Sequence, residues 1–264
     1  MLIFVNHDDM RSLELMEELL RRGYYVSDQF KDLKFAEVIY LGVKGIDRKH
    51  RLYVKNGTVV IPNYVIENWN KKTRVYTLIE NEYLRELSKT NCFQYISLLS
   101  HEDFLNKNSI LTAEGLISYL IEHRRFPLYQ SRILVLGYGH CAKPIISYLL
   151  AFHAQVSVGL RNHSLKDEIE SIGCQYTNLN HLDMNQDIII NTIPHVIIDK
   201  EKIDQMSKQC FVIDIASYPY GIDHHYALSQ GYHCQILPSI PCKYAYGYAG
   251  KMIADEIEKG NENA

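Results

Sequence analysis

The sequence predicts an α/β protein made of two Rossmann-like, doubly wound domains, with a C-terminal helix that returns to the first domain. Three observations support this class. The chain has 264 residues, which is more than a typical single domain contains. Short apolar runs of strand length alternate with stretches of helical periodicity, which favours parallel strands flanked by helices. Finally, the aliphatic run 133–136 leads directly into a glycine-rich turn.

Composition excludes several classes of protein. Hydrophobic residues make up 47% of the chain and charged residues 22%, which is typical of a folded globular protein rather than a disordered one. The net charge is -3 and no basic stripe is present, so nucleic-acid binding is not expected. The densest basic segments, 48–51 and 123–125, are short and favour solvated turns or helix ends.

The sequence also predicts a cytoplasmic location. The apolar start, 1–5, is shorter than the core of a signal peptide and is not preceded by basic residues. No run approaches the roughly 18 apolar residues of a membrane helix. The six cysteines form no CxxC pair, so we expect reduced, buried thiols and no metal site.

The first domain is expected over residues 1–126. Apolar runs and the glycines between them predict a strand, a helix ended by Gly23, a second strand, a hairpin, a second helix and a third strand. In order, these elements are 2–5, 13–20, 38–41, 51–54 with 58–61, 83–87 and 94–99. Thr112 is expected to cap a connecting helix that runs to about Arg125, where Phe126-Pro127 ends it.

The second domain is expected over residues 127–243. Strands are predicted at 133–136, 155–158, 188–190 and 211–213, with helical stretches between them. The remaining segment, about 244–264, is predicted to form a helix over 248–258 that packs against the first domain.

A dinucleotide site is predicted at the turn Gly137-Tyr138-Gly139-His140-Cys141-Ala142. Gly137 permits the tight bend, Gly139 lets the backbone approach a pyrophosphate, and the small Ala142 lets the following helix pack on the strand. The helix N-terminus then faces the anion. The competing interpretation is a glycine loop that binds no ligand.

The end of the second strand predicts NADP rather than NAD. NAD sites place an acidic residue there, about 20 residues after the turn, to bind the ribose hydroxyls. This chain instead has Arg161-Asn162-His163-Ser164. Arg161 can pair with a 2′-phosphate, and Asn162 and Ser164 can add hydrogen bonds. The alternative is that Arg161 is an ordinary surface arginine.

Three later loops follow the carboxyl ends of predicted strands, where ligands of this fold bind. The loop 191–195 should border the nicotinamide ribose, with Thr192 and Pro194 against the cofactor. The loops 214–219 and 237–243 should border the substrate.

Over nearly its whole length the chain resembles the A subunit of dipicolinate synthase. Besides the glycine turn, the match is carried by Asp9-Met10-Arg11, Thr112-Ala113-Glu114-Gly115, Asn191-Thr192-Ile193-Pro194, Asp214-Ile215-Ala216-Ser217 and Ala249-Gly250. The departures are His7 and Asp8 in place of two glycines, Tyr220 in place of the first of a glycine pair, Cys242 in place of a glycine and Gly247 in place of a lysine. The departures cluster at the expected substrate side, so the resemblance supports the identity of the cofactor more directly than that of the substrate.

The resemblance implies a dehydrogenase that forms pyridine-2,6-dicarboxylate from a dihydrodipicolinate-type precursor. It also implies NADP as the hydride acceptor and partnership with a flavoprotein B subunit. The candidates for holding the dicarboxylate are Arg11 and Lys243, both expected at strand-end loops, and Ser217. His195 is the candidate proton acceptor, whereas Asp9 can orient Arg11.

Other interpretations stay open at this point. The same two-domain plan suits an NADP-dependent reductase of another small 2-hydroxy, 2-imino or opine-type acid, or a non-catalytic subunit that binds NADP(H). Proteins of this plan often dimerise, so a homodimer is possible by analogy. The adjacent pair His224-His225 is expected on a solvated helix face rather than at a metal, because neighbouring helical residues point apart.

Overall fold

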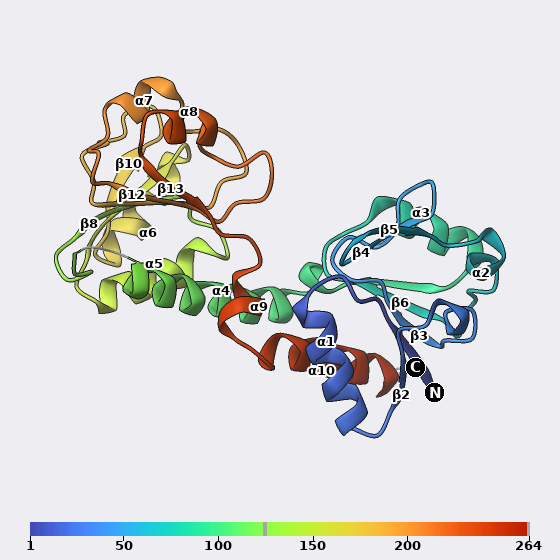
Figure 1. Cartoon of the computed structure of the whole chain (residues 1–264). Helices are drawn as coiled ribbons and strands as arrows, with labels where there is room; N and C mark the ends of the chain where they lie inside the picture. The colour runs from blue at the N-terminus through green and yellow to red at the C-terminus, as the bar shows by residue number, and fades with distance from the viewer. Residues whose placement is uncertain (124–125, 263–264) are drawn as a thin grey trace. The chain divides into compact units, whose positions relative to one another are not determined.

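The computed structural model describes residues 1–123 and 126–262 and confirms the predicted α/β class (Figure 1). The chain divides into two compact units. The first contains Met1–Asn108 and the segment from Ala245 onward, and the second contains Ser109–Tyr244. The sequence placed the first boundary after residue 126, whereas this division falls within the long helix α4 (Glu102–His123). Arg124 and Arg125, which complete the predicted basic segment and connecting helix, lie outside the described residues.

The first unit is built on a parallel sheet with the strand order β2-β1-β3-β6-β7. The strands are β1 (Leu2–Val5), β2 (Tyr25–Ser27), β3 (Val38–Tyr40), β6 (Arg74–Thr77) and β7 (Gln94–Ser97). The helical segments are α1 (Met10–Arg21), η1 (Phe30–Asp32), α2 (Asn63–Glu67), α3 (Glu82–Asn91), η2 (Leu98–Ser100) and α10 (Tyr248–Glu262). The predicted hairpin pairs β4 (Arg51–Val54) with β5 (Gly57–Val60) in an antiparallel ladder.

The second unit contains a parallel sheet with the strand order β10-β9-β8-β11-β12-β13. The strands are β8 (Arg132–Leu136), β9 (Gln155–Leu160), β10 (Gln175–Asn178), β11 (Ile188–Asn191), β12 (Phe211–Asp214) and β13 (His233–Ile236). The helical segments are α5 (Ala142–Ala151), η3 (His163–Leu165), α6 (Lys166–Ser171), α7 (Lys200–Asp204), α8 (His224–Ser229) and α9 (Ile240–Tyr244). This order places the change of direction between β8 and β11, as in dinucleotide-binding folds.

The central strand of the second unit is buried on both faces. Ile133 and Val135 join a core with residues of α4 and α5, while Leu134 and Leu136 join a separate core on the opposite face. Parallel sheets covered on both faces have this continuous apolar pattern. The buried sheet therefore fixes where β8 ends and the glycine turn begins.

Thr112 does not cap a helix, so this sequence prediction was wrong. Helix α4 begins at Glu102, and Thr112 lies buried within it. The earlier turns are anchored by Phe104, which is buried, whereas the residues before it, Glu102 and Asp103, are charged and exposed. Gly115 occupies the middle of the helix because a side chain there would overlap Ile240 and Tyr244 of α9.

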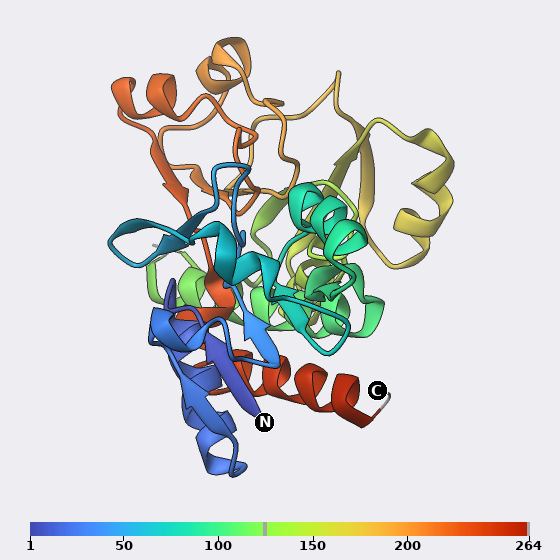
Figure 2. The same cartoon turned by 90° about the vertical axis from the view of Figure 1, so that its right-hand side faces the viewer.

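The C-terminal helix α10 packs against α1 within the first unit, which confirms the predicted return of this helix (Figure 1, Figure 2). The two helices approach closely at Gly250, where any side chain would overlap the backbone of Glu14. The Gly250 amide donates to Oε2 of the buried Glu14 (3.0 Å). A glycine is required there for close packing of the two helices.

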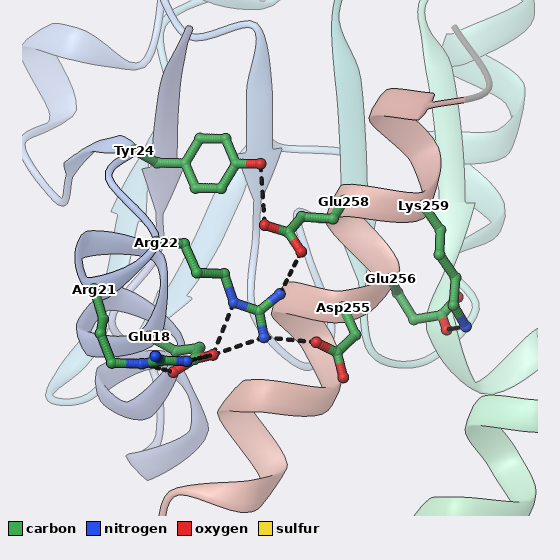
Figure 3. A network of polar contacts seen from close by, with 8 residues as sticks. All are labelled: Glu18, Arg21, Arg22, Tyr24, Asp255, Glu256, Glu258 and Lys259. Atoms are coloured by element: carbon green, nitrogen blue, oxygen red, sulfur yellow. Dashed lines mark hydrogen bonds and ion pairs between the residues drawn. The ribbon is translucent and has the colours of Figure 1, made fainter.

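Arg22, which follows α1, joins the two helices through three carboxylates (Figure 3). Its guanidinium lies 2.6 Å from Glu18 of α1 and from both Asp255 and Glu258 of α10. The Tyr24 hydroxyl donates to Glu258 (3.1 Å). Because planar guanidinium groups bind several carboxylates in fixed geometry, this cluster orients α10 on α1.

Acid should weaken the first unit through Glu18. Hydrogen bonds from Arg21 and then Arg22 lower the pKa of Glu18 to about 2. A carboxyl whose pKa is lower in the folded than in the unfolded chain stabilises the fold at neutral pH, and this contribution disappears as the pH falls from about 4.5 to about 2. The difference in urea-unfolding midpoint between the parent and Glu18→Gln should therefore shrink over that pH interval. Glu17→Gln, an exposed neighbour on α1, is the control and should show no such change; a constant difference for Glu18→Gln would contradict the assignment.

Candidate dinucleotide site

The candidate site lies at the carboxyl ends of β8 and β11, where the strand order of the second unit reverses. The glycine turn follows β8, and the loop 192–195 follows β11. Both loops lie beside each other because Asn191 pairs with Leu136 at the ends of these parallel strands. Dinucleotides bind across this crevice in doubly wound sheets.

The glycine turn fits a bound pyrophosphate. Gly137 has a φ of 102°, and a side chain there would overlap the hydroxyl of Thr192. Gly139 is exposed, and a Cβ built there meets no atom within 4 Å. The turn thus has open space above Gly139, next to the N-terminus of α5, where Ala142 is fully buried against the sheet. These are the steric and electrostatic conditions that a pyrophosphate needs.

The remaining residues of the turn lie around this opening. Nζ of Lys143 lies over the ring of Tyr138, 4.7 Å from the ring centroid, in a cation–π contact. The same Nζ forms an ion pair with Glu168 (3.3 Å). His140 is exposed and Cys141 is partly buried. Burial raises the pKa of the Cys141 thiol, so it stays protonated at neutral pH and fills space rather than acting as a nucleophile.

Arg161 lies exposed at the carboxyl end of β9 and, among the described residues, has no ion-pair partner. The neighbouring Asn162 accepts hydrogen bonds on Oδ1 from the amide (3.0 Å) and the hydroxyl (2.8 Å) of Ser164. Asn162 and Ser164 therefore stabilise each other at the start of η3 and hold the segment after Arg161 in place.

The loop after β11 is fixed by its own side chains. Oγ1 of Thr192 donates to the Leu136 carbonyl (2.8 Å), which holds the loop against the glycine turn. Oδ1 of Asn191 accepts from the Ile193 amide (3.1 Å). Pro194 and His195 are exposed beyond this anchored part. The structure thus brings Thr192 and the glycine turn together and leaves His195 accessible.

Asp214, the last residue of β12, is fully buried and accepts hydrogen bonds on both oxygens. Oδ1 accepts from Nδ2 of Asn191 (2.8 Å) and from the Ala216 amide (3.0 Å). Oδ2 accepts from the Gly221 amide (2.8 Å) and lies 3.0 Å from Nε2 of His224. The carboxylate therefore joins the loops that follow β11 and β12 at the edge of the sheet where the glycine turn lies.

The side chain of His224 packs against the buried Asp214 carboxylate, so the prediction that His224 lies on a solvated face was wrong. Its side chain is 14% exposed, and Nδ1 lies 3.1 Å from Sγ of Cys234. Burial raises the pKa of the Cys234 thiol to about 12, so Sγ keeps its proton at neutral pH. Two features of the sequence pointed toward the contact between Asp214 and His224. The apolar strand β12 ends in the acidic Asp214, and Asp223 caps the helix that begins with His224.

The residues predicted to hold a substrate differ in exposure and in the elements that carry them. Ser217 is exposed in the loop after β12, and its carbonyl accepts from the Tyr220 amide (2.9 Å). Lys243 is exposed on α9 of the same unit rather than in a loop. In the first unit, Arg11 lies in the first turn of α1, is buried and pairs with Asp9 (2.8 Å).

Within the residues that the structure describes, no cluster of histidine, cysteine and acidic side chains is arranged to hold a metal ion. Across the same residues, no helix combines the length and the apolar character that crossing a membrane requires.

Comparison with known proteins identifies relatives over both units. Residues 112–217 match the family described as D-isomer specific 2-hydroxyacid dehydrogenase, NAD binding domain. The A subunit of dipicolinate synthase from Bacillus subtilis (strain 168) is 30% identical over 188 residues, which are 70% of this chain and 63% of that protein. The crystal structure of the B. subtilis protein has a TM-score of 0.85 and 25% identity over 100% of this chain and 96% of that chain. The corresponding protein of Bacillus halodurans has a TM-score of 0.83 and 27% identity over 98% and 96%.

The chain is similar to dipicolinate synthase A subunits in both sequence and fold. The resemblance predicted from its short motifs is thereby confirmed. The aligned region is 63% of the B. subtilis protein's length, so the reaction and partners of that protein do not follow from this similarity. The apo-structure of D-lactate dehydrogenase from Escherichia coli, with 13% identity and a TM-score of 0.65, shows a shared fold alone.

The departures from the dipicolinate synthase pattern have structural consequences. Asp8, where the resemblance predicts a glycine, accepts hydrogen bonds from the Val43 amide (2.7 Å) and the Ser12 hydroxyl (2.8 Å), and burial raises the pKa of its carboxyl. Tyr220, which also replaces a glycine, has a φ of 69°. Gly221 is retained, because a side chain there would overlap Asn191.

Proposed function

We propose that this dipicolinate synthase relative is an NADP-dependent oxidoreductase that forms pyridine-2,6-dicarboxylate from a dihydrodipicolinate-type precursor. The observation that supports NADP as the cofactor is the glycine turn combined with the exposed Arg161. In NAD sites, an acidic residue at this position binds a ribose hydroxyl. The family relationship supports the substrate, because the named relatives are dipicolinate synthase A subunits.

The residues of the second unit would hold the cofactor at its ends. Gly137 and Gly139 would admit the pyrophosphate, Arg161 would pair with the 2′-phosphate, and Thr192 and Pro194 would border the nicotinamide ribose. When bound, the oxidised nicotinamide accepts a hydride from a ring carbon of the precursor, and a proton lost from the precursor ring completes its aromatic system. We assign His195, exposed after β11, as the acceptor of that proton.

On the second unit, Ser217 and Lys243 would hold the substrate carboxylates. Arg11 of the first unit stays a carboxylate-binding candidate predicted from the sequence. Arg11 is already paired with Asp9, which holds its planar guanidinium in one orientation. The family relationship also supports partnership with a flavoprotein B subunit, and a homodimer is the simplest assembly for this plan.

Replacing Arg161 by aspartate should weaken NADPH binding about tenfold or more, because a charge-assisted contact is lost and a repulsive charge is introduced. Calorimetric titration with NADPH measures the change. Lys208→Asp alters the net charge by the same amount at an exposed position before the amino end of β12 and should leave NADPH affinity within twofold. Equal NADPH affinity in the parent and Arg161→Asp would rule out a 2′-phosphate contact.

A second candidate function is favoured by the match of residues 112–217 to the NAD-binding domain of D-isomer specific 2-hydroxyacid dehydrogenases. On this alternative, the protein reduces another small 2-hydroxy or 2-imino acid precursor with NADPH. A panel of 2-oxo, 2-imino and cyclic dicarboxylic acids, followed at the NADPH absorbance band, separates the two functions. Saturable NADPH binding without turnover of any acid would instead favour a non-catalytic subunit.

A further inference from the structure

Tyr218 is held out into solvent at the end of β12, beside the candidate site. Its side chain is 83% exposed. A single exposed tyrosine on a mobile loop would carry no functional meaning. The residues that flank Tyr218, however, are hydrogen-bonded to neighbouring segments, and loops presented by an anchored scaffold are where binding residues concentrate.

The loop that carries Tyr218 is fixed on both sides. Asp214 accepts from the amides of Ala216 and Gly221, which flank the loop. The Gly221 carbonyl accepts from the amides of Ile197 and Ile198 (2.9 and 3.0 Å). The backbone of Tyr218 thus lies between two hydrogen-bonded points, so little backbone conformational entropy is lost when a ligand binds.

Tyr218 is the outermost of three aromatic rings that contact one another in sequence, Tyr218, Tyr220 and His224. The rings of Tyr220 and Tyr218 pack edge to face, with their centroids 5.8 Å apart and their planes at 83°. The rings of Tyr220 and His224 pack in the same way, with a centroid distance of 5.7 Å and an interplanar angle of 82°. Tyr220 adopts a φ of 69°, a conformation that residues other than glycine rarely take. Strained backbone of this kind concentrates at ligand sites. Here it accompanies the edge-to-face contact between Tyr220 and Tyr218.

The loop lies on the side of the site where the reacting ring of a dinucleotide belongs. Arg161, at the end of β9, marks the adenosine side of β8, and β11 and β12 follow on the other side. The loops after β11 and β12 are joined through Asn191 and Asp214. A substrate that meets the nicotinamide therefore passes the loop that displays Tyr218.

We propose that Tyr218 is the specificity-determining residue that selects a planar, unsaturated ring acid over a puckered, saturated one, an inference that rests on the proposed function. The face of a phenol ring is electron-rich, whereas a pyridine ring bearing two carboxyl groups is flat and electron-poor. Two such rings stack in offset geometry. A saturated ring with the same two carboxylates cannot make this contact, so the carboxylate-binding residues alone would not distinguish the two acids.

The test measures binding rather than turnover. The full chain, saturated with NADP, is titrated by calorimetry with pyridine-2,6-dicarboxylate and with cis-piperidine-2,6-dicarboxylate. The parent should prefer the pyridine acid. Tyr218→Ala should lose about five- to tenfold in affinity for the pyridine acid and stay within twofold for the piperidine acid, while Tyr218→Phe should keep the preference.

Tyr129→Ala is the matched control, because Tyr129 is 58% exposed and precedes the opposite, amino end of β8; it should change neither affinity. Equal affinity of the parent and Tyr218→Ala for the pyridine acid would overturn the role of Tyr218 and leave the proposed function intact. Equal losses for both acids would overturn the selection of planar rings. If the parent bound NADP but neither acid, both this inference and the proposed substrate would fall, while the cofactor assignment would stand.

Discussion

Replacing Asp214 by alanine should lower the free energy of unfolding of the second unit by about 3–5 kcal/mol. The carboxylate is fully buried and accepts hydrogen bonds on both oxygens. Its removal takes one of the two acceptors from the Asn191 side chain and leaves two backbone amides and His224 without the carboxylate that they contact. A buried donor left without an acceptor costs far more than an exposed one, because it loses its hydrogen bonds to water on folding.

Thermal or urea unfolding followed by circular dichroism measures the loss. The control is Asp167→Ala, an exposed residue in the first turn of α6, which should change the free energy of unfolding by less than about 1 kcal/mol. His224→Ala should lie between the two, since Asp214 keeps its other donors. If Asp214→Ala were as stable as the control, the carboxylate would not be holding the two loops.

The centre of the second unit could be predicted well because its central strands are buried on both faces. β8, β11 and β12 are continuous aliphatic runs, and such runs stand out in a sequence. The glycine turn was equally clear, since Gly137 needs a φ of 102° and its context between strand and helix is diagnostic. Local sequence and tertiary environment point to the same structure at these positions.

Edge strands and long-range contacts could not be read in the same way. β2 and β10 are short and partly exposed, and neither contains an apolar run of strand length. The start of α4 was missed because its first turns are mostly polar and depend on tertiary packing of Phe104. The contact between His224 and Asp214 joins two elements through a buried carboxylate, and periodicity within α8 carries no information about it.

Replacing Gly137 by alanine should weaken NADPH binding at least tenfold and destabilise the second unit by about 2–3 kcal/mol. Two effects combine at this position. The φ of 102° disfavours any residue with a side chain, and a Cβ would overlap the hydroxyl of Thr192. That hydroxyl donates to the Leu136 carbonyl, so relief of the overlap requires the loop after β11 to move away from the turn.

Gly173→Ala separates the two effects. Gly173 has a φ of 90°, but no atom lies within 4 Å of a Cβ built there. Its replacement should cost about 1 kcal/mol from the backbone alone and leave NADPH affinity unchanged. Titration of both variants with NADPH, beside their unfolding curves, therefore isolates the contribution of the contact between Gly137 and Thr192. Equal NADPH affinity in the two variants would show that the cofactor does not depend on this contact, and the pyrophosphate would then have to be placed elsewhere on the sheet edge.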